Sequence, residues 1–169
     1  VKALVKEPDQ KLFVDWTPYL AHDWQVRGDT QYPLEKFQAL AHRLGQIPEG
    51  FSVQRQVGRI YEDRNKMAAG AVPCNWGFGE TMAYATLLEQ GYPVRITGQD
   101  VGRGTFSHRH AVLHDQNTAE CHVPLQSVSE GQPSFDIFDS LLSEVAVLGF
   151  EYGYATTNPL GLVIWEAQF

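Results

Sequence analysis

Apolar side chains dominate residues 139–153, and we predict that this stretch forms a helix of about three turns. Asp139 or Ser140 can serve as its N-cap, and Gly153 can end it in a left-handed conformation. The apolar positions fall into two stripes, one of Leu141, Val145, Leu148 and Tyr152 and the other of Leu142, Ala146 and Gly149. Because the helix is apolar nearly all round, we expect it to be buried.

Two acids interrupt this apolar pattern. Glu144 and Glu151 share one face of the predicted helix, and Glu144 has Val147 and Leu148 as neighbours. A carboxylate among such neighbours is costly to ionise unless a partner hydrogen-bonds it, so Glu144 is a candidate for proton chemistry. The alternative is an ordinary acid in the first turn, stabilised by the helix dipole. Glu151 lies nearer the helix end, where we expect it to reach solvent.

Three further helices are predicted from apolar residues at helical spacing. The first covers residues 34–44 and lies between Pro33 and Gly45, the second lies within residues 51–70, and the third covers residues 76–91. The second helix has a polar face that we expect in solvent: Arg55, Arg59 and Arg64.

Short runs of β-branched residues alternate with these helices. Residues 92–98 follow a helix and predict a parallel strand, residues 160–165 predict a second buried strand, and residues 111–113 form a possible short one. The polar segment 115–134 is typical of a long surface connection. The predicted fold class is therefore α/β, with a largely parallel sheet flanked by helices. In such sheets ligands bind at the carboxyl ends of the strands, which is where the Gly-rich loop Gln99–Gly104 lies.

A break at Pro48 and Gly50 divides the chain into two predicted parts. Residues 1–50 form an irregular and helical extension that packs on a neighbouring domain, and its aromatic segment Trp16–Leu20 is a predicted docking arm. Residues 51–169 form the α/β domain.

Composition excludes several classes of protein. The net charge of −7 argues against a nucleic acid or an anionic membrane as the main partner. Two widely spaced cysteines, Cys74 and Cys121, indicate a reducing compartment rather than a disulfide framework. No apolar run reaches membrane-spanning length. The chain begins without Met and stops after an apolar run, so we expect it to be a piece of a longer polypeptide.

Four sequence blocks carry a resemblance to one family of enzymes. Along the chain they are residues 98–110, Pro124-Leu125, residues 142–154, and Trp165-Glu166-Ala167-Gln168-Phe169. In this order they resemble the thiamine-diphosphate-dependent decarboxylating component of 2-oxoglutarate dehydrogenase. The resemblance covers most of the chain from about residue 51 onward, and four ordered blocks make it specific.

This resemblance implies a fold and a reaction. The fold is a transketolase-like pyrimidine-binding domain, truncated at its C-terminus, and the reaction is oxidative decarboxylation of 2-oxoglutarate with transfer of the succinyl group to a lipoyl arm. In the family, a Glu nine residues before a Gly bonds N1′ of the cofactor, and Glu144 and Gly153 have this separation. Gln99 corresponds to a cofactor contact in the strand-end loop. The alternative for this loop is a turn satisfied by its own side chains, and Asp100 with Arg103 can be a surface ion pair.

The resemblance also implies parts that these residues lack. The Gly-Asp-Gly run followed by Asn, which binds magnesium and the diphosphate, is absent from these residues and is expected in another domain across a subunit interface. The aromatic residue that stacks on the pyrimidine falls beyond the last residue, so Phe169 is only a second-best candidate for that contact. We therefore expect a homodimer with a shared active site, a lipoyl domain of the dihydrolipoyl succinyltransferase as partner, and an inactive isolated segment. The implied location is the cytoplasm in a bacterium or the mitochondrial matrix in a eukaryote.

His108, Arg109 and His110 form a basic cluster with three open interpretations. Its place in the family block implies a site that holds an anionic substrate, and a purely structural role is an equal alternative. In the third interpretation, His108 and His110 bind zinc together with His114 or His122 in a non-catalytic binding module. Within the enzyme class, the alternatives are a dehydrogenase of 2-oxoadipate and a non-oxidative 2-oxo acid decarboxylase.

Overall fold

The computed structural model describes residues 14–141 and 143–167, which form four helices and five strands. The helices are α1 (Leu34–Leu44), α2 (Arg55–Ala68), α3 (Trp76–Glu89) and α4 (Glu144–Thr157), with 3-10 turns η1 (Thr17–Tyr19) and η2 (Pro124–Ser127). The strands are β1 (Val94–Gly98), β2 (Leu113–His114), β3 (Cys121–His122), β4 (Phe135–Asp139) and β5 (Leu162–Glu166). No helix in these described ranges is long and apolar enough to cross a bilayer.

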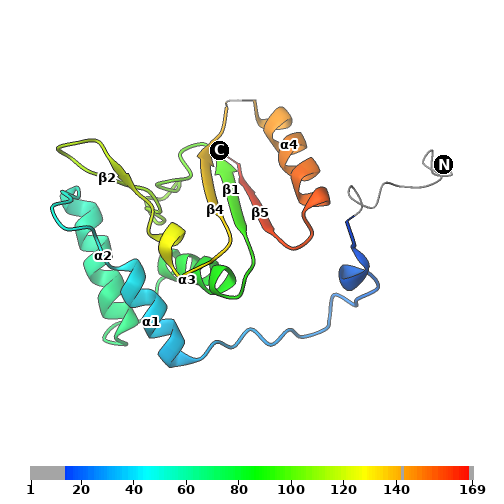
Figure 1. The fold of residues 1–169 in the computed structure, drawn as a ribbon, viewed down its shortest axis with the longest axis horizontal. Coiled ribbons are helices and arrows are strands. Elements are labelled where there is room, and N and C mark those ends of the chain that lie inside the picture. Colours follow the sequence, from blue (N-terminus) through cyan, green and yellow to red (C-terminus); the bar gives the residue numbers. More distant parts are fainter. Residues whose placement is uncertain (1–13, 142, 168–169) are drawn as a thin grey trace.

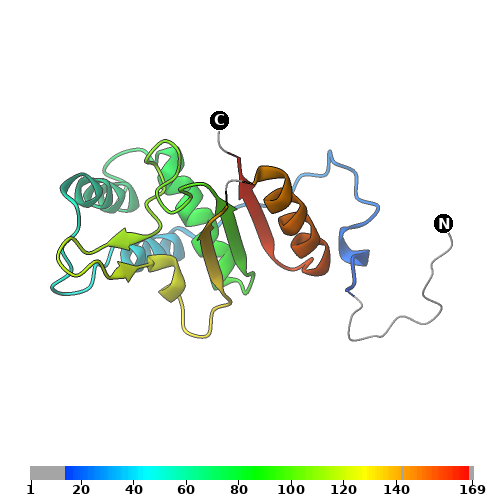
Figure 2. The ribbon, with the colours of Figure 1, turned by 90° about the horizontal axis from the view of Figure 1, so that it is seen from above.

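A parallel sheet organises the domain. Its strand order is β4-β1-β5, with Val94 of β1 opposite Phe135 of β4 and Leu162 of β5. The carboxyl ends of all three strands lie together at the upper edge of the sheet in Figure 1. Helices α1, α2 and α3 lie on one side of the sheet and α4 on the other (Figure 2). The predicted α/β fold class, with its parallel sheet and flanking helices, is confirmed.

The main core lies between α3 and one face of the sheet. Ile96 of β1 and Leu88 of α3 have no exposed surface, and Phe135 of β4 packs in the same cluster. Helix α1 adds Leu40 and Leu44 to this cluster. The first helix therefore shares the core of the sheet, although the sequence break led us to group it with an extension ending at residue 50.

Helix α4 packs against the opposite face of the sheet, beside β5. Its one buried side chain in the described range is Glu151, which binds Arg95 of β1 at 2.8 Å. Our prediction that Glu151 reaches solvent was wrong, because Arg95 stands on the sheet face that α4 covers. The Arg95 guanidinium also lies over the rings of Phe138, Phe150 and Tyr154.

The apolar stripes of α4 are not buried within this chain. Val145 is 87% exposed and Tyr152 is 72% exposed, so the predicted burial of the helix is wrong for the chain by itself. The physical reason is that three strands and η1 offer too little surface to cover a helix that is apolar nearly all round. Leu142, which we placed in the second stripe, lies outside the described residues.

The start and the end of α4 also differ from the prediction. Asp139 is the last residue of β4, a strand that we did not predict, and the helix begins five residues later at Glu144. The strand forms because β1 offers it a parallel partner. Gly153 has helical neighbours on both sides and does not end the helix, which continues to Thr157.

Two polar segments are more buried than their composition suggests. The stretch 115–134, predicted as a surface connection, contains β3 and η2, and Leu125 and Val128 enter the core. Arg64, predicted in solvent, is buried on α2 and donates to the carbonyl oxygens of His108 and Arg109.

The N-terminal part of the described chain contacts α4. The indole of Trp16 donates to the Thr156 carbonyl oxygen.

Asp115 connects the β2–β3 hairpin to the segment before α2. Its carboxylate accepts hydrogen bonds from the backbone N–H groups of Ser52, Asn117 and Thr118 at 2.7, 2.7 and 3.0 Å. These bonds hold the pKa of Asp115 below its ordinary value. These bonds therefore stabilise the fold fully above about pH 4, the ordinary pKa of an Asp side chain in the unfolded protein. The stabilisation is lost as the pH falls through the lower pKa that Asp115 has in the folded protein.

We expect Asp115→Ala to lower the melting temperature of the complete protein at neutral pH. The difference from wild type should shrink once the pH falls below about 4, because protonation then removes the same bonds in wild type. Thermal unfolding across this pH range checks the prediction. Asp63→Ala, which removes only an exposed pair with Lys66, is the control. A constant difference between Asp115→Ala and wild type at every pH would contradict it.

Candidate functional site

The carboxyl edge of the parallel sheet brings together the segments that follow β1, β4 and β5. Residues 99–112 follow β1 here, Ser140 and Leu141 follow β4, α4 begins at Glu144, and Glu166 ends β5 (Figure 1). Open α/β sheets bind ligands at this edge. The structure therefore places the Gly-rich loop and the start of α4 at the same edge, as a shared binding site requires.

Gln99 occupies the turn directly after β1 and is half-buried. The preceding Gly98 has no room for a side chain, since a Cβ atom there would lie 2.4 Å from the Glu166 carbonyl oxygen. The carboxyl ends of strands β1 and β5 can therefore approach this closely only because residue 98 is glycine. Asp100 follows in a left-handed conformation, and its carboxylate accepts from Arg103 Nε at 2.6 Å, which is the surface pair that we considered.

Glu144 is the first residue of α4 and is exposed. The helix N-terminus carries no side-chain cap from Ser143. The predicted apolar surroundings of this carboxylate are not present within the described residues, because Leu148 is exposed and Val147 is only half-buried. The carboxylate is thus accessible at the sheet edge, and polypeptide outside the described residues would have to cover it to give the dry site that we predicted.

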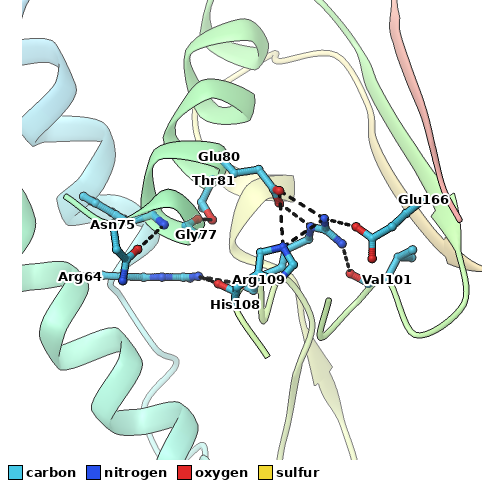
Figure 3. A network of polar contacts seen from close by, with 10 residues as sticks. Arg64, Asn75, Gly77, Glu80, Thr81, Val101, His108, Arg109 and Glu166 are labelled. Atoms are coloured by element: carbon cyan, nitrogen blue, oxygen red, sulfur yellow. Dashed lines mark hydrogen bonds and ion pairs between the residues drawn. The ribbon is translucent and has the colours of Figure 1, made fainter. Parts of the chain in front are cut away.

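Arg109 is the centre of a buried ion-pair network (Figure 3). Its guanidinium donates to Glu80 of α3 at 2.5 Å, to Glu166 at the end of β5, and to the carbonyl oxygen of Val101 at 2.9 Å. Burial opposes the charge, but the hydrogen bonds to the two carboxylates outweigh it and raise the pKa of Arg109. With its side chain 3% exposed, this geometry favours the structural role for Arg109 over contact with a substrate.

The two histidines of the basic cluster have different surroundings. His108 Nε2 lies 3.5 Å from Glu80 Oε2, and the His108 carbonyl oxygen accepts from Arg64. His110 borders a cavity of about 450 Å³ between α2, the β2 segment and the end of β4. Burial and the positive charge of Arg64 lower the pKa of His110, so its neutral form is favoured.

The zinc interpretation finds no support in the geometry. Within residues 14–141 and 143–167, no group of three or more His, Cys, Asp or Glu side chains is placed to hold a metal ion. His114 instead lies 3.3 Å from Cys121 Sγ across the β2–β3 hairpin. Phe169, the second-best candidate for stacking on a pyrimidine, lies outside the described residues.

Sequence reasoning did not identify the network around Arg109. Glu80 and Glu166 both pair with Arg109, but the sequence pattern predicted this partner for neither acid, and Glu166 was noticed only as part of a sequence block. The sequence offered one clue: Glu80, Glu166 and the basic cluster of residues 108–110 lie on three segments that the predicted topology brings to one region. Charged residues on separate elements give no periodic pattern, so their pairing becomes visible only in the fold.

The chain is similar to known proteins over nearly its whole length. It is 65% identical over 168 residues to the 2-oxoglutarate dehydrogenase E1 component of Azotobacter vinelandii, which covers 99% of this chain and 18% of that protein. The proteins of the same name from Cupriavidus necator and Haemophilus influenzae are 52% and 49% identical over 163 and 156 residues. Those alignments cover 94% and 92% of this chain and 17% of each relative. The chain thus spans less than a fifth of the length of these curated relatives.

A domain family matches the part of the chain that holds the sheet. Residues 73–169 match the family described as transketolase, pyrimidine binding domain. The match begins just before α3, includes all three strands of the parallel sheet and α4, and takes in more than half of the 169 residues. The chain belongs to the transketolase pyrimidine-binding domain family.

Proposed function

We propose that the complete protein catalyses the thiamine-diphosphate-dependent oxidative decarboxylation of 2-oxoglutarate and transfers the succinyl group to a lipoyl arm. The observation that carries this proposal is the 65% identity, over 99% of this chain, to a protein named 2-oxoglutarate dehydrogenase E1 component. This chain would supply the half of the active site that activates the pyrimidine ring of the cofactor.

The residues at the sheet edge fit one half of thiamine diphosphate. Glu144 offers an accessible carboxylate at the start of α4, and Gln99 offers an amide at the end of β1. The diphosphate half would need a magnesium site, and the described ranges 14–141 and 143–167 hold no cluster of three metal-binding side chains. We therefore assign the magnesium and diphosphate ligands to another part of the protein.

When bound, thiamine diphosphate supplies the nucleophilic carbon and the electron sink of the decarboxylation. Glu144 holds a proton at N1′ of the aminopyrimidine, which makes the 4′-amino group of the same ring a better base. Gln99 orients the ring from the strand-end loop. A covered and poorly solvated carboxyl at Glu144 would share this proton with the ring rather than release it to water.

A homodimer would provide that cover. Helix α4 presents Val145, Phe150 and Tyr152 to solvent, at 87%, 63% and 72% exposure. Apolar surface of this kind marks a contact with another polypeptide. We propose that a second subunit covers α4, and that the site at the start of α4 is completed by that subunit.

The proposed partner in the transfer step is the lipoyl domain of the dihydrolipoyl succinyltransferase. The proposed location is the cytoplasm if the source is a bacterium.

Substrate assays of the complete protein test this function. Purified protein with thiamine diphosphate, magnesium and a lipoyl domain should decarboxylate 2-oxoglutarate and succinylate the lipoyl arm. A strong preference for 2-oxoadipate would show that the proposed substrate is wrong. Release of a free aldehyde without acylation of the lipoyl domain would show that the proposed reaction is wrong. One zinc ion per chain, surviving dialysis and lost with His108→Ala and His110→Ala, would instead favour the binding module.

A further inference from the structure

The backbone of Val101 is held by side chains from two other segments. Its N–H donates to Asp139 Oδ1 at 2.9 Å, and its carbonyl oxygen accepts from Arg109 Nη1 at 2.9 Å. The Val101 side chain is fully buried. A residue fixed at both backbone atoms and at its side chain acts as a rigid anchor for the loop before it.

A second backbone bond fixes the other end of that loop. The N–H of Ser140 donates to the carbonyl oxygen of Gly98 at 2.7 Å. Gln99 and Asp100 therefore lie between two residues, Gly98 and Val101, that are both bonded to the segment Asp139-Ser140. The position of Gln99 depends directly on the position of the chain at the end of β4.

The same segment precedes α4 in the chain. Asp139 ends β4, and Glu144 starts the helix after a connection of four residues. Asp139 is thus bonded to the loop that carries Gln99 and lies on the path that leads to Glu144. Because Asp139 is itself exposed, its carboxylate is not part of the hydrophobic core.

We propose that Asp139 is a positioning residue that couples the strand-end loop to the end of β4. Its carboxylate holds the loop that carries Gln99 against the end of this strand, so that Gln99 is placed to meet the aminopyrimidine ring. The consequence for the cofactor rests on the proposed function, whereas the coupling of the two segments rests only on the contacts given above.

Amide hydrogen exchange of the complete protein, without cofactor, tests the coupling directly. In Asp139→Ala the segment 99–105 should exchange roughly tenfold faster than in wild type, because Val101 N–H loses a charged acceptor. Asp139→Asn keeps an oxygen at the same place and should restore most of the protection. Asp136→Ala is the matched control, since it removes a carboxylate from the same strand whose hydrogen bond is to Ser134 and not to the loop. Equal exchange in wild type and Asp139→Ala would overturn the proposal.

Cofactor measurements on the same variants test the consequence. Asp139→Ala should weaken thiamine diphosphate binding and slow exchange of the cofactor C2 proton by roughly tenfold, while Asp139→Asn and Asp136→Ala should stay near wild type. The melting temperature of all three should remain near that of wild type. Unchanged binding and C2 exchange in Asp139→Ala would overturn the positioning role. If wild type binds no thiamine diphosphate, the proposed function fails, and the amide exchange result still decides whether Asp139 couples the two segments.

Discussion

Replacing Glu144 with Ala in the complete enzyme should lower the turnover of 2-oxoglutarate by roughly 10²–10⁴-fold, the range that proton transfer by a positioned group contributes. The reason is that no other acid in our assignment bonds N1′, so the 4′-amino group would lose the proton donor that makes it basic. Glu144→Gln should lose nearly as much, because an amide cannot share a proton with the ring in the same way.

The fold should survive this change. Glu144 is exposed at the first position of α4 and makes no contribution to the core cluster, so the melting temperature without cofactor should stay within a few degrees of wild type. Glu130→Ala, which removes an exposed acid outside α4 and outside the proposed site, is the control. Exchange of the cofactor C2 proton should slow in parallel with turnover. If the cofactor C2 proton exchanges in Glu144→Ala at the wild-type rate, Glu144 does not hold the proton at N1′.

The second large effect is expected at Arg109. In Arg109→Met the carboxylates of Glu80 and Glu166, which are only 27% and 21% exposed in the wild-type structure, lose their shared partner. Breaking a buried ion pair by removing one partner costs about 3–5 kcal/mol, because the remaining charge is poorly solvated. The Val101 carbonyl oxygen also loses its donor. We therefore expect a markedly lower midpoint of thermal unfolding, or an unfolded domain at the temperature of expression.

A neighbouring arginine provides a matched control. Arg103 lies on the same loop, and its partner Asp100 is 51% exposed, so Arg103→Met should cost no more than about 1 kcal/mol. Arg109→Lys keeps the charge but not the planar fork, and should fall between wild type and Arg109→Met. Equal unfolding midpoints for Arg103→Met and Arg109→Met would contradict the structural role of Arg109.

Elements with their own periodic pattern were predictable from the sequence. The helix over residues 34–44 and the strand within residues 92–98 agree with α1 and β1, and the predicted helix 76–91 contains α3. Each is long enough, or bounded clearly enough by Pro and Gly, for local pattern to determine it. Strand β4 was missed because its five residues alternate only partly, and pairing with β1 rather than local preference makes it a strand.

Charged residues were the main source of error. Arg64 and Glu151 are buried, although their side chains were predicted in solvent. Each is buried because a partner from a distant segment satisfies it, and sequence spacing does not show such partners. The features of the candidate site also divide into those that the predicted topology gives and those that only the fold shows. The placement of the Gly-rich loop at the strand ends followed from topology, whereas the bonds from Asp139 and Arg109 to Val101 could come only from the fold.

The exposure of α4 has a different origin. Its sequence is that of a buried helix, yet the described chain leaves Val145 and Tyr152 in solvent. A hydrophobic pattern reflects burial in the complete assembly, and this chain spans less than a fifth of the length of its relatives. The mismatch between pattern and exposure is therefore an argument that further polypeptide covers α4 in the complete protein, and the proposed second subunit would supply it.

A structure of the complete protein with thiamine diphosphate bound tests the assignment of Glu144 most directly. We predict that a second subunit covers the start of α4 and that a carboxyl oxygen of Glu144 lies within hydrogen-bond distance of N1′, about 2.6–3.2 Å. A Glu144 side chain that points into bulk water, with another acid at N1′, would contradict the account.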